Sequence, residues 1–126
     1  MQQQHLFFLQ RMNDHVQYLN KIKRTLSNQG NFQGLDCHQC ALGKWLYGEG
    51  RAQAKQLGEE VRKLFDQLIE PHAAFHEASA RALNCHQRGD EVGKYRAMTD
   101  MHKLSTGLIQ KLLDMDKYAN QQRKLA

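Results

Sequence analysis

The chain has 126 residues, of which 40% are hydrophobic and 25% are charged, and its formal net charge is +5. This length is typical of one domain, and we predict that residues 1–126 form a single unit with its own core. The sequence contains no apolar run of about 18 residues, so we expect no direct insertion into a membrane.

The first predicted helix covers residues 3–28. Apolar residues and two histidines recur along it at intervals of three and four, which places them on one helical face: His5, Phe8, Met12, His15, Leu19, Ile22 and Leu26. A loop with two glycines follows at residues 29–36. We then expect a short helical piece near residues 38–47, ended by the Gly-Glu-Gly sequence at 48–50, and a second small piece at 52–57.

The third predicted helix begins near Glu59, and Pro71 either kinks it or starts a fresh helix. Its apolar face continues past the proline to Leu83. Gly89 ends this helix, and Asp90 is a suitable cap for a fourth helix over residues 91–123. Strand signals are almost absent, so the predicted class is all-α. The expected architecture is an antiparallel four-helix bundle whose second helix is short or replaced by short helical pieces.

Two histidines on the third helix form a candidate metal site. His72 and His76 are four residues apart, so they lie one turn apart on the same helical face. Two imidazoles in this arrangement can bind one metal ion, although pairs at this spacing also arise by chance. Here the pair lies on the apolar face, where two buried imidazoles without partners would be costly. A shared metal ion would satisfy both.

His15 and Cys40 can complete this site. Taken alone, His15 is better explained as a core histidine bonded to a carbonyl or a carboxylate. Together with His72 and His76 it is better explained as a ligand, because antiparallel packing brings mid-helix positions together. Cys40 begins a helical segment, and a cysteine at a helix start ionises readily. Its thiolate would give a four-coordinate site with three nitrogens and one sulfur, which favours zinc.

The other cysteines and histidines have weaker patterns. Cys37 forms a Cys-x-x-Cys pair with Cys40, but no βαβ context supports a thioredoxin-like role, so we interpret Cys37 as a spare thiol. We expect Cys85 to be a half-buried apolar residue. His38 could substitute for a ligand, and His102 could contact a ligand without binding the metal itself. No partner pattern is visible for His5 and His86.

Four other kinds of protein compete with a closed zinc site as explanations of these residues. A di-iron carboxylate bundle uses Glu-x-x-His motifs, and no histidine here has an acidic residue three positions before it. A hemerythrin-like di-iron bundle and a metal-free helical interaction module remain the alternatives. A hydrolytic zinc enzyme needs an open metal position and a general base. Glu77 follows His76 but lies about 100° around the helix, so we expect no enzymatic activity.

The sequence also indicates a location. Its first residues show neither a basic start nor a small-residue cleavage site, so we expect no signal peptide. Three cysteines are an odd number, which does not fit a secreted disulfide framework and favours the reducing cytoplasm. The basic residues are spread along the chain, so solvated helix faces explain the positive charge and we expect no nucleic-acid partner.

With Cys40 placed, the sequence resembles the chemoreceptor zinc-binding (CZB) domain family. The resemblance rests on four features, one of which is the order of the ligands along the chain: His, Cys, His, His. His15 is followed by an aromatic residue at Tyr18, and residues 40–45 read Cys-Ala-Leu-Gly-Lys-Trp. The His72–His76 pair follows on the third helix, and the similarity covers roughly residues 5–120. Within the 40–45 segment we expect Gly43 to lie near the site and Trp45, with Tyr47, to pack the segment onto the bundle.

The resemblance implies a zinc-binding four-helix bundle with a sensory role in the bacterial cytoplasm. Members are usually attached to chemotaxis receptors or diguanylate cyclases, so a signalling partner of this kind is expected, and a homodimer is plausible. The implied signals are zinc itself and oxidants such as hypochlorous acid, which attack the ligating cysteine. The output would be chemotaxis or cyclic-di-GMP signalling. Cys37 as a resolving thiol for oxidised Cys40 is our own inference and not a family property.

Overall fold

The computed structural model describes the backbone of residues 2–125 and the side chains of residues 8–121. Within this range the chain forms helices and no strands, so the predicted all-α class is confirmed. Three helices are long: α1 (Gln2–Leu26), α5 (Ile69–Arg88) and α6 (Glu91–Leu125). Three are short: α2 (Ala41–Leu46), α3 (Gly50–Gln56) and α4 (Glu59–Asp66). None of the helices in the described range is long and apolar enough to span a membrane.

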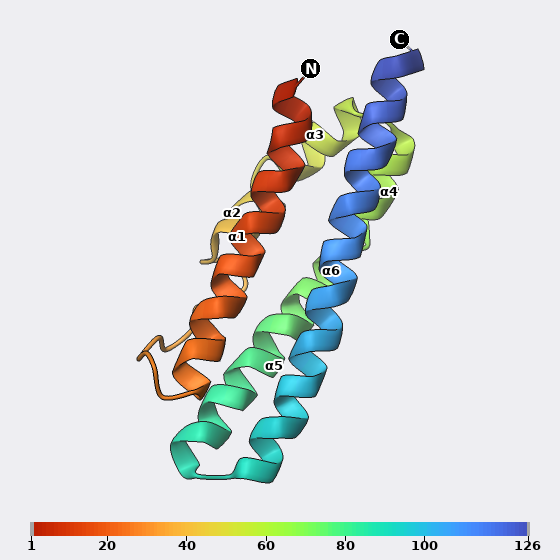
Figure 1. The fold of residues 1–126 in the computed structure, drawn as a ribbon. Helices are drawn as coiled ribbons and strands as arrows, with labels where there is room; N and C mark the ends of the chain where they lie inside the picture. Colours follow the sequence, from red (N-terminus) through yellow and green to blue (C-terminus); the bar gives the residue numbers. More distant parts are fainter. Residues whose placement is uncertain (1, 126) are drawn as a thin grey trace.

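The long helices lie alongside one another, with α6 packed against α1, α4 and α5 (Figure 1). Helices α5 and α6 run in opposite directions and are joined by a tight turn. Gly89 makes this turn in the left-handed region, with φ of 74°. The Asp90 carboxylate accepts a hydrogen bond from the Gly93 N–H at 2.9 Å, which confirms the predicted cap.

The predicted third helix is divided into α4 and α5. Helix α4 ends at Asp66, and α5 begins at Ile69, so Pro71 lies in the first turn of a fresh helix. A proline is tolerated there because an N–H in the first turn has no partner within the helix. The apolar face continues across the break, since Phe65, Leu68 and Phe75 are all buried.

Trp45 packs the cysteine segment, residues 40–45, against the core. Trp45 of α2 is buried, its ring lies 5.2 Å from that of Phe65, and its indole N–H donates to Gln53 at 2.8 Å. The expectation that Trp45 packs this segment onto the bundle is confirmed. Tyr47 contributes less to this packing, because it is 40% exposed and stacks on His38, and its ring lies 6.3 Å from that of His72 on α5.

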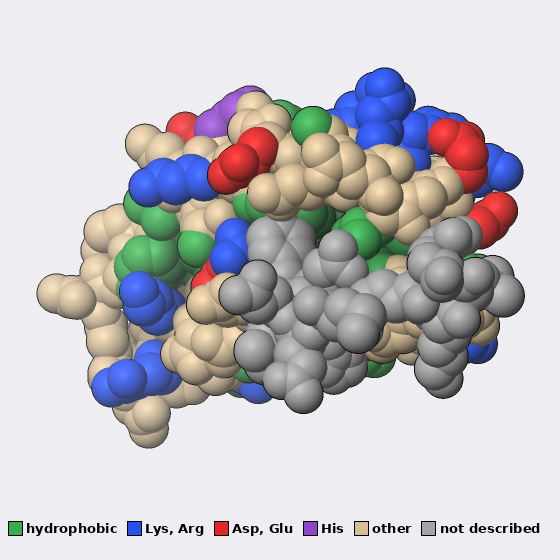
Figure 2. All heavy atoms as spheres, turned by 90° about the horizontal axis from the view of Figure 1, so that it is seen from above, with side chains coloured by type: hydrophobic (Ala, Val, Ile, Leu, Met, Phe, Trp, Pro, Cys, Tyr) green, Lys and Arg blue, Asp and Glu red, His purple; other side chains and the backbone are tan. Residues whose placement is uncertain are grey.

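Charged side chains are mixed on the surface. In the view of Figure 2, Lys and Arg side chains lie in several separate groups, some beside Asp and Glu. On α4, Arg62 forms ion pairs with Glu59 at 2.9 Å and with Asp66 at 2.6 Å. Such exposed pairs contribute little to stability, about 0–1 kcal/mol each. The free energy of folding therefore comes mainly from the apolar interior.

Candidate metal centre

Three of the four predicted ligands lie together inside the molecule. The Cys40 thiol and one ring nitrogen each of His72 and His76 are all within 4.8 Å of one another, and the three residues are buried. The distance from Cys40 Sγ to His72 Nε2 is 3.3 Å. In a tetrahedral zinc site, bond lengths of about 2.0–2.1 Å to nitrogen and 2.3 Å to sulfur separate neighbouring ligand atoms by about 3.5 Å. The donor atoms therefore suit zinc in kind, and the separation of Cys40 and His72 matches that of neighbouring zinc ligands.

Cys40 is the N-cap of α2. Its side chain accepts a hydrogen bond from the Gly43 N–H at 3.2 Å, which fixes the sulfur over the first turn of the helix. Burial raises the pKa of the Cys40 thiol, and the backbone donors of Gly43 and Leu42 offset only part of that effect. The expectation that this thiol ionises readily by itself is therefore wrong. A bound cation would be needed to keep it as a thiolate.

Gly43 permits this cap. A Cβ atom at Gly43 would overlap the carbonyl oxygen of Cys37 and would lie 3.2 Å from the Cys40 sulfur. The Cys37 carbonyl belongs to the backbone, so it cannot move aside as a flexible side chain could. Only glycine allows the turn before α2 to pass this close to the helix, which explains why Gly43 lies in this segment.

His72 and His76 are neutral in the folded protein. Burial, together with the neighbouring His76, lowers the pKa of His72 from 6.5 to about 3. Burial also lowers the pKa of His76. Neutral imidazole is the form that binds a metal ion.

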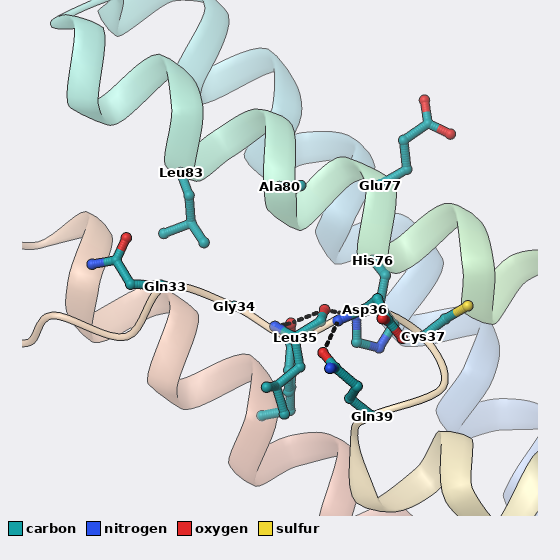
Figure 3. A pocket seen from close by; sticks show the side chains of 11 residues that line it. Gln33, Gly34, Leu35, Asp36, Cys37, Gln39, His76, Glu77, Ala80 and Leu83 are labelled. Atoms are coloured by element: carbon teal, nitrogen blue, oxygen red, sulfur yellow. Dashed lines mark hydrogen bonds between the residues drawn. The ribbon is translucent and has the colours of Figure 1, made fainter.

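The ring of His76 has a defined tautomer. Its Nδ1 lies 2.9 Å from the carbonyl oxygen of Leu35, as Figure 3 shows. A carbonyl can only accept, so Nδ1 carries the proton and Nε2 presents its lone pair. Metal-binding histidines characteristically donate their other ring N–H to a carbonyl or carboxylate in this way. His72 differs, because its buried Nδ1 has no hydrogen-bond partner among the described residues.

His15 is close to this cluster but does not belong to it. It is buried, its Nε2 lies 2.8 Å from the Ser105 hydroxyl of α6, and its ring meets the edge of Phe75. Burial, with a contribution from His76, lowers the pKa of His15 to about 4. In this arrangement His15 is a core histidine, bonded to a hydroxyl rather than to a carbonyl or carboxylate. Its role as a fourth ligand stays a prediction.

Sequence reasoning missed Ser105, although a signal was present. The buried stripe of α6 contains Met101, Leu108 and Leu112, and Ser105 occupies a position of the same stripe. A polar residue among buried apolar ones needs a partner, and here the partner is His15. His102, which was expected to support the site, is only half-buried. Ser105 is the residue of α6 that contacts His15.

The remaining candidates lie outside the cluster. The Cys37 sulfur contacts Tyr47 Oη at 3.7 Å and His38 Nδ1 at 3.5 Å, and in Figure 3 it is directed away from His76. The side chain of His38 is exposed, and His86 is bonded to the Asn28 amide oxygen. Cys85 is buried, rather than half-buried as expected. The side chain of His5 lies outside the described residues.

A pocket of about 450 Å³ opens beside the cluster, between the loop before α2 and helix α5. His76 and Cys37 are among the residues that line it (Figure 3). Solvent and small solutes therefore have a route to the neighbourhood of the site on this side.

Comparison with known families agrees with this geometry. The model of the chemoreceptor zinc-binding domain matches residues 15–83, a range that begins at His15 and contains Cys40, His72 and His76. The chain belongs to the chemoreceptor zinc-binding domain family. Its cofactor is zinc, and Cys40, His72 and His76 are positioned to bind it. No curated protein and no solved structure gives a significant match.

This zinc-binding domain should lose stability in acid when a chelator keeps it free of zinc. The pKa of His72 is about 3 and that of His15 about 4 in the folded protein, against 6.5 ordinarily. At a pH between these folded-state pKa values and 6.5, the two histidines bind protons in the unfolded chain but not in the folded chain. The free energy of unfolding is therefore highest above pH 6.5 and falls as the pH drops toward 4. The maximum slope is about 1.4 kcal/mol per histidine for each pH unit.

Urea denaturation in EDTA at several pH values between 7.5 and 5 measures this slope. We expect uptake of more than one proton on unfolding near pH 5, and a slope smaller by about one proton in His72→Gln. A free energy of unfolding that does not change between pH 7 and pH 5 would contradict the buried, neutral state of these histidines.

Proposed function

We propose that this domain is a regulatory zinc sensor of the bacterial cytoplasm, in which His15, Cys40, His72 and His76 hold one zinc ion. The observation that carries the proposal is the buried group of one thiol and two imidazoles, which come from helices far apart in the sequence. The group contains no carboxylate, so nothing favours a di-iron centre.

A closed structural zinc site has four protein ligands, and His15 is the best candidate for the fourth. It is buried and neutral, and it interacts electrostatically with both His72 and His76. To reach the metal, His15 would either release Ser105 or bind through its other ring nitrogen. A fourth protein ligand leaves no open position for a substrate, which supports a regulatory role rather than an enzymatic one.

Cys40 would make the site sensitive to oxidants. Its thiolate would be the only negatively charged ligand and the only one that oxidants readily convert to another species. Hypochlorous acid would oxidise the sulfur to a sulfenic acid and be reduced to chloride. Cys37, three residues away, could then displace water from the sulfenic acid to form a disulfide. Its side chain would first have to leave Tyr47.

The signal would then pass to a partner. The four proposed ligands lie on α1, α5 and the start of α2. We propose that these helices belong to a four-helix bundle in which the short helices α2 and α3 take the place of the second helix. Loss of one bond would change how these helices pack, and packed helices shift between discrete arrangements. We propose a chemoreceptor, a diguanylate cyclase or another signalling protein as the partner, and a homodimer as the assembly.

The test is zinc release on oxidation. The zinc-loaded domain is treated with a few equivalents of hypochlorous acid while a zinc-binding dye reports release, and mass spectrometry locates the modified residue. We expect about one zinc per chain before treatment, and release in step with oxidation of Cys40. Cys37→Ser should still release zinc but should not form the disulfide. Retained zinc with Met12 or Met98 oxidised first would refute redox sensing in this chain.

A further inference from the structure

The loop before α2 is held to α1 by one side chain. The Tyr18 hydroxyl accepts a hydrogen bond from the Leu35 N–H at 2.9 Å and donates one to the Leu35 carbonyl at 3.0 Å. The same carbonyl accepts the Nδ1 proton of His76 at 2.9 Å (Figure 3). A carbonyl oxygen has two lone pairs, so it can accept both bonds. Tyr18 and the candidate ligand His76 are therefore linked through a single peptide group.

Apolar packing does little to hold this part of the loop. The Leu35 side chain is 42% exposed, and the preceding Gly34 has a φ of 87° and no side chain to bury. The hydrogen bonds of the Leu35 N–H and C=O groups thus determine where its carbonyl lies. The tyrosine ring reinforces the link, because it lies 4.7 Å from the His76 ring.

The loop also leads directly to Cys40. After Leu35, the Asp36 N–H donates to Gln39 Oε1 at 3.1 Å, and the His38 N–H donates to Asp36 Oδ1 at 2.7 Å. These local bonds stiffen the turn between Leu35 and the cysteine. An anchor at Leu35 therefore constrains the position of the sulfur as well as the tautomer of His76.

We propose that Tyr18 is a positioning residue of the zinc site, acting through its hydroxyl. By holding the Leu35 carbonyl in place, it keeps the proton of His76 on Nδ1 and directs Nε2 to the metal. This proposal rests on the proposed zinc-sensing function. It assigns to one hydroxyl group a role that the aromatic ring alone could not perform.

The test compares Tyr18→Phe with Thr25→Val. Tyr18→Phe keeps the ring, which packs on Phe32 and Phe75, and removes only the hydroxyl. Thr25 is a matched control, because its hydroxyl accepts the Phe32 N–H at 2.9 Å and so anchors the same loop to the same helix, away from His76. We expect zinc affinity, measured by competition with a chelating dye, to fall about 10–100-fold in Tyr18→Phe and to stay near the parent value in Thr25→Val.

Nitrogen-15 NMR of the histidine rings gives a second readout that needs no zinc. In the zinc-free parent, His76 should be protonated at Nδ1 alone, and in Tyr18→Phe it should become a mixture of tautomers. Three results would each overturn the proposal. They are a zinc affinity of Tyr18→Phe equal to that of the parent, a loss of zinc affinity in Thr25→Val as large as in Tyr18→Phe, and a His76 tautomer that Tyr18→Phe leaves unchanged. Failure of the parent to bind zinc would instead refute the proposed function, and the tautomer comparison would still test Tyr18.

Discussion

Replacing Cys40 by alanine should cause the largest loss of zinc affinity of any single substitution in this domain. Cys40 supplies the only sulfur of the buried cluster and the only charge that a protein ligand would bring to the metal. Removal of Cys40 should lower zinc affinity by more than about 10–100-fold, which is the loss expected when only a hydrogen-bond partner of a ligand is removed. The measurement is zinc competition against a dye, with the cobalt(II) absorption spectrum as a report of thiolate binding.

Two other cysteines provide controls for this result. Cys85→Ala removes a buried sulfur that accepts a contact from Arg88 and lies outside the cluster, so its zinc affinity should equal that of the parent. Cys37→Ala should also retain zinc, because the Cys37 sulfur faces Tyr47 and His38. Retention in Cys40→Ala together with loss in Cys37→Ala would mean that the wrong cysteine had been assigned.

His15→Ala belongs to the same series and tests the coordination number. As the fourth ligand, His15 should contribute to affinity, and its loss should change the cobalt(II) spectrum. Full affinity and an unchanged spectrum in this variant would leave three protein ligands and an open position. That result would make an enzymatic role worth testing again.

Alanine at Gly43 should disrupt the site without removing any ligand atom. The added Cβ would overlap the Cys37 carbonyl, so the turn before α2 would have to open and carry the Cys40 sulfur away from the cluster. Overpacking of this kind costs roughly 1–3 kcal/mol in the free energy of unfolding. We expect a lower melting temperature and a large loss of zinc affinity, measured by thermal denaturation and by dye competition.

Gly107 provides the matched glycine control. It lies within α6, and a Cβ added there would meet no atom within 4 Å. Gly107→Ala should therefore retain zinc affinity and raise stability by about 0.4–1 kcal/mol, because alanine restricts the unfolded chain. Equal zinc affinity in Gly43→Ala and Gly107→Ala would show that the close approach at Gly43 does not control the site.

Side-chain periodicity was sufficient to predict the long helices and which of their faces is buried. His15, His72 and His76 lie on those faces at helical spacing, and all three are buried as expected. Sequence also placed Cys40 near the start of a short helical piece, and in the structure it is the N-cap of α2. It did not settle whether Pro71 kinks a helix or begins one, because both outcomes keep the same apolar face.

The contacts of the site were harder to predict because they depend on backbone atoms and on distant partners. The carbonyl that bonds His76 belongs to Leu35, and every residue carries such a group, so no residue type marks it. The Ser105 hydroxyl lies 90 positions from His15, a pairing that follows only from how α1 packs on α6. The raised pKa of Cys40 was missed because burial, which sequence position does not reveal, outweighs the effect of the helix start.

The spacing of Cys40 and His72 has a consequence for chain topology. The two residues are 32 positions apart, and the segment between them contains all of α2, α3 and α4. Helices of six to eight residues are not stable alone in water, so these three depend on the ends of the segment being held. A zinc ion bound by both residues would close this segment into a ring, as a disulfide would. For a ring of this size the chain-entropy model gives about 3–4 kcal/mol of stabilisation. Unlike a disulfide, this cross-link would open under the proposed oxidation of its sulfur. An oxidising environment would then loosen a quarter of the chain, whereas it would tighten a chain closed by an ordinary disulfide.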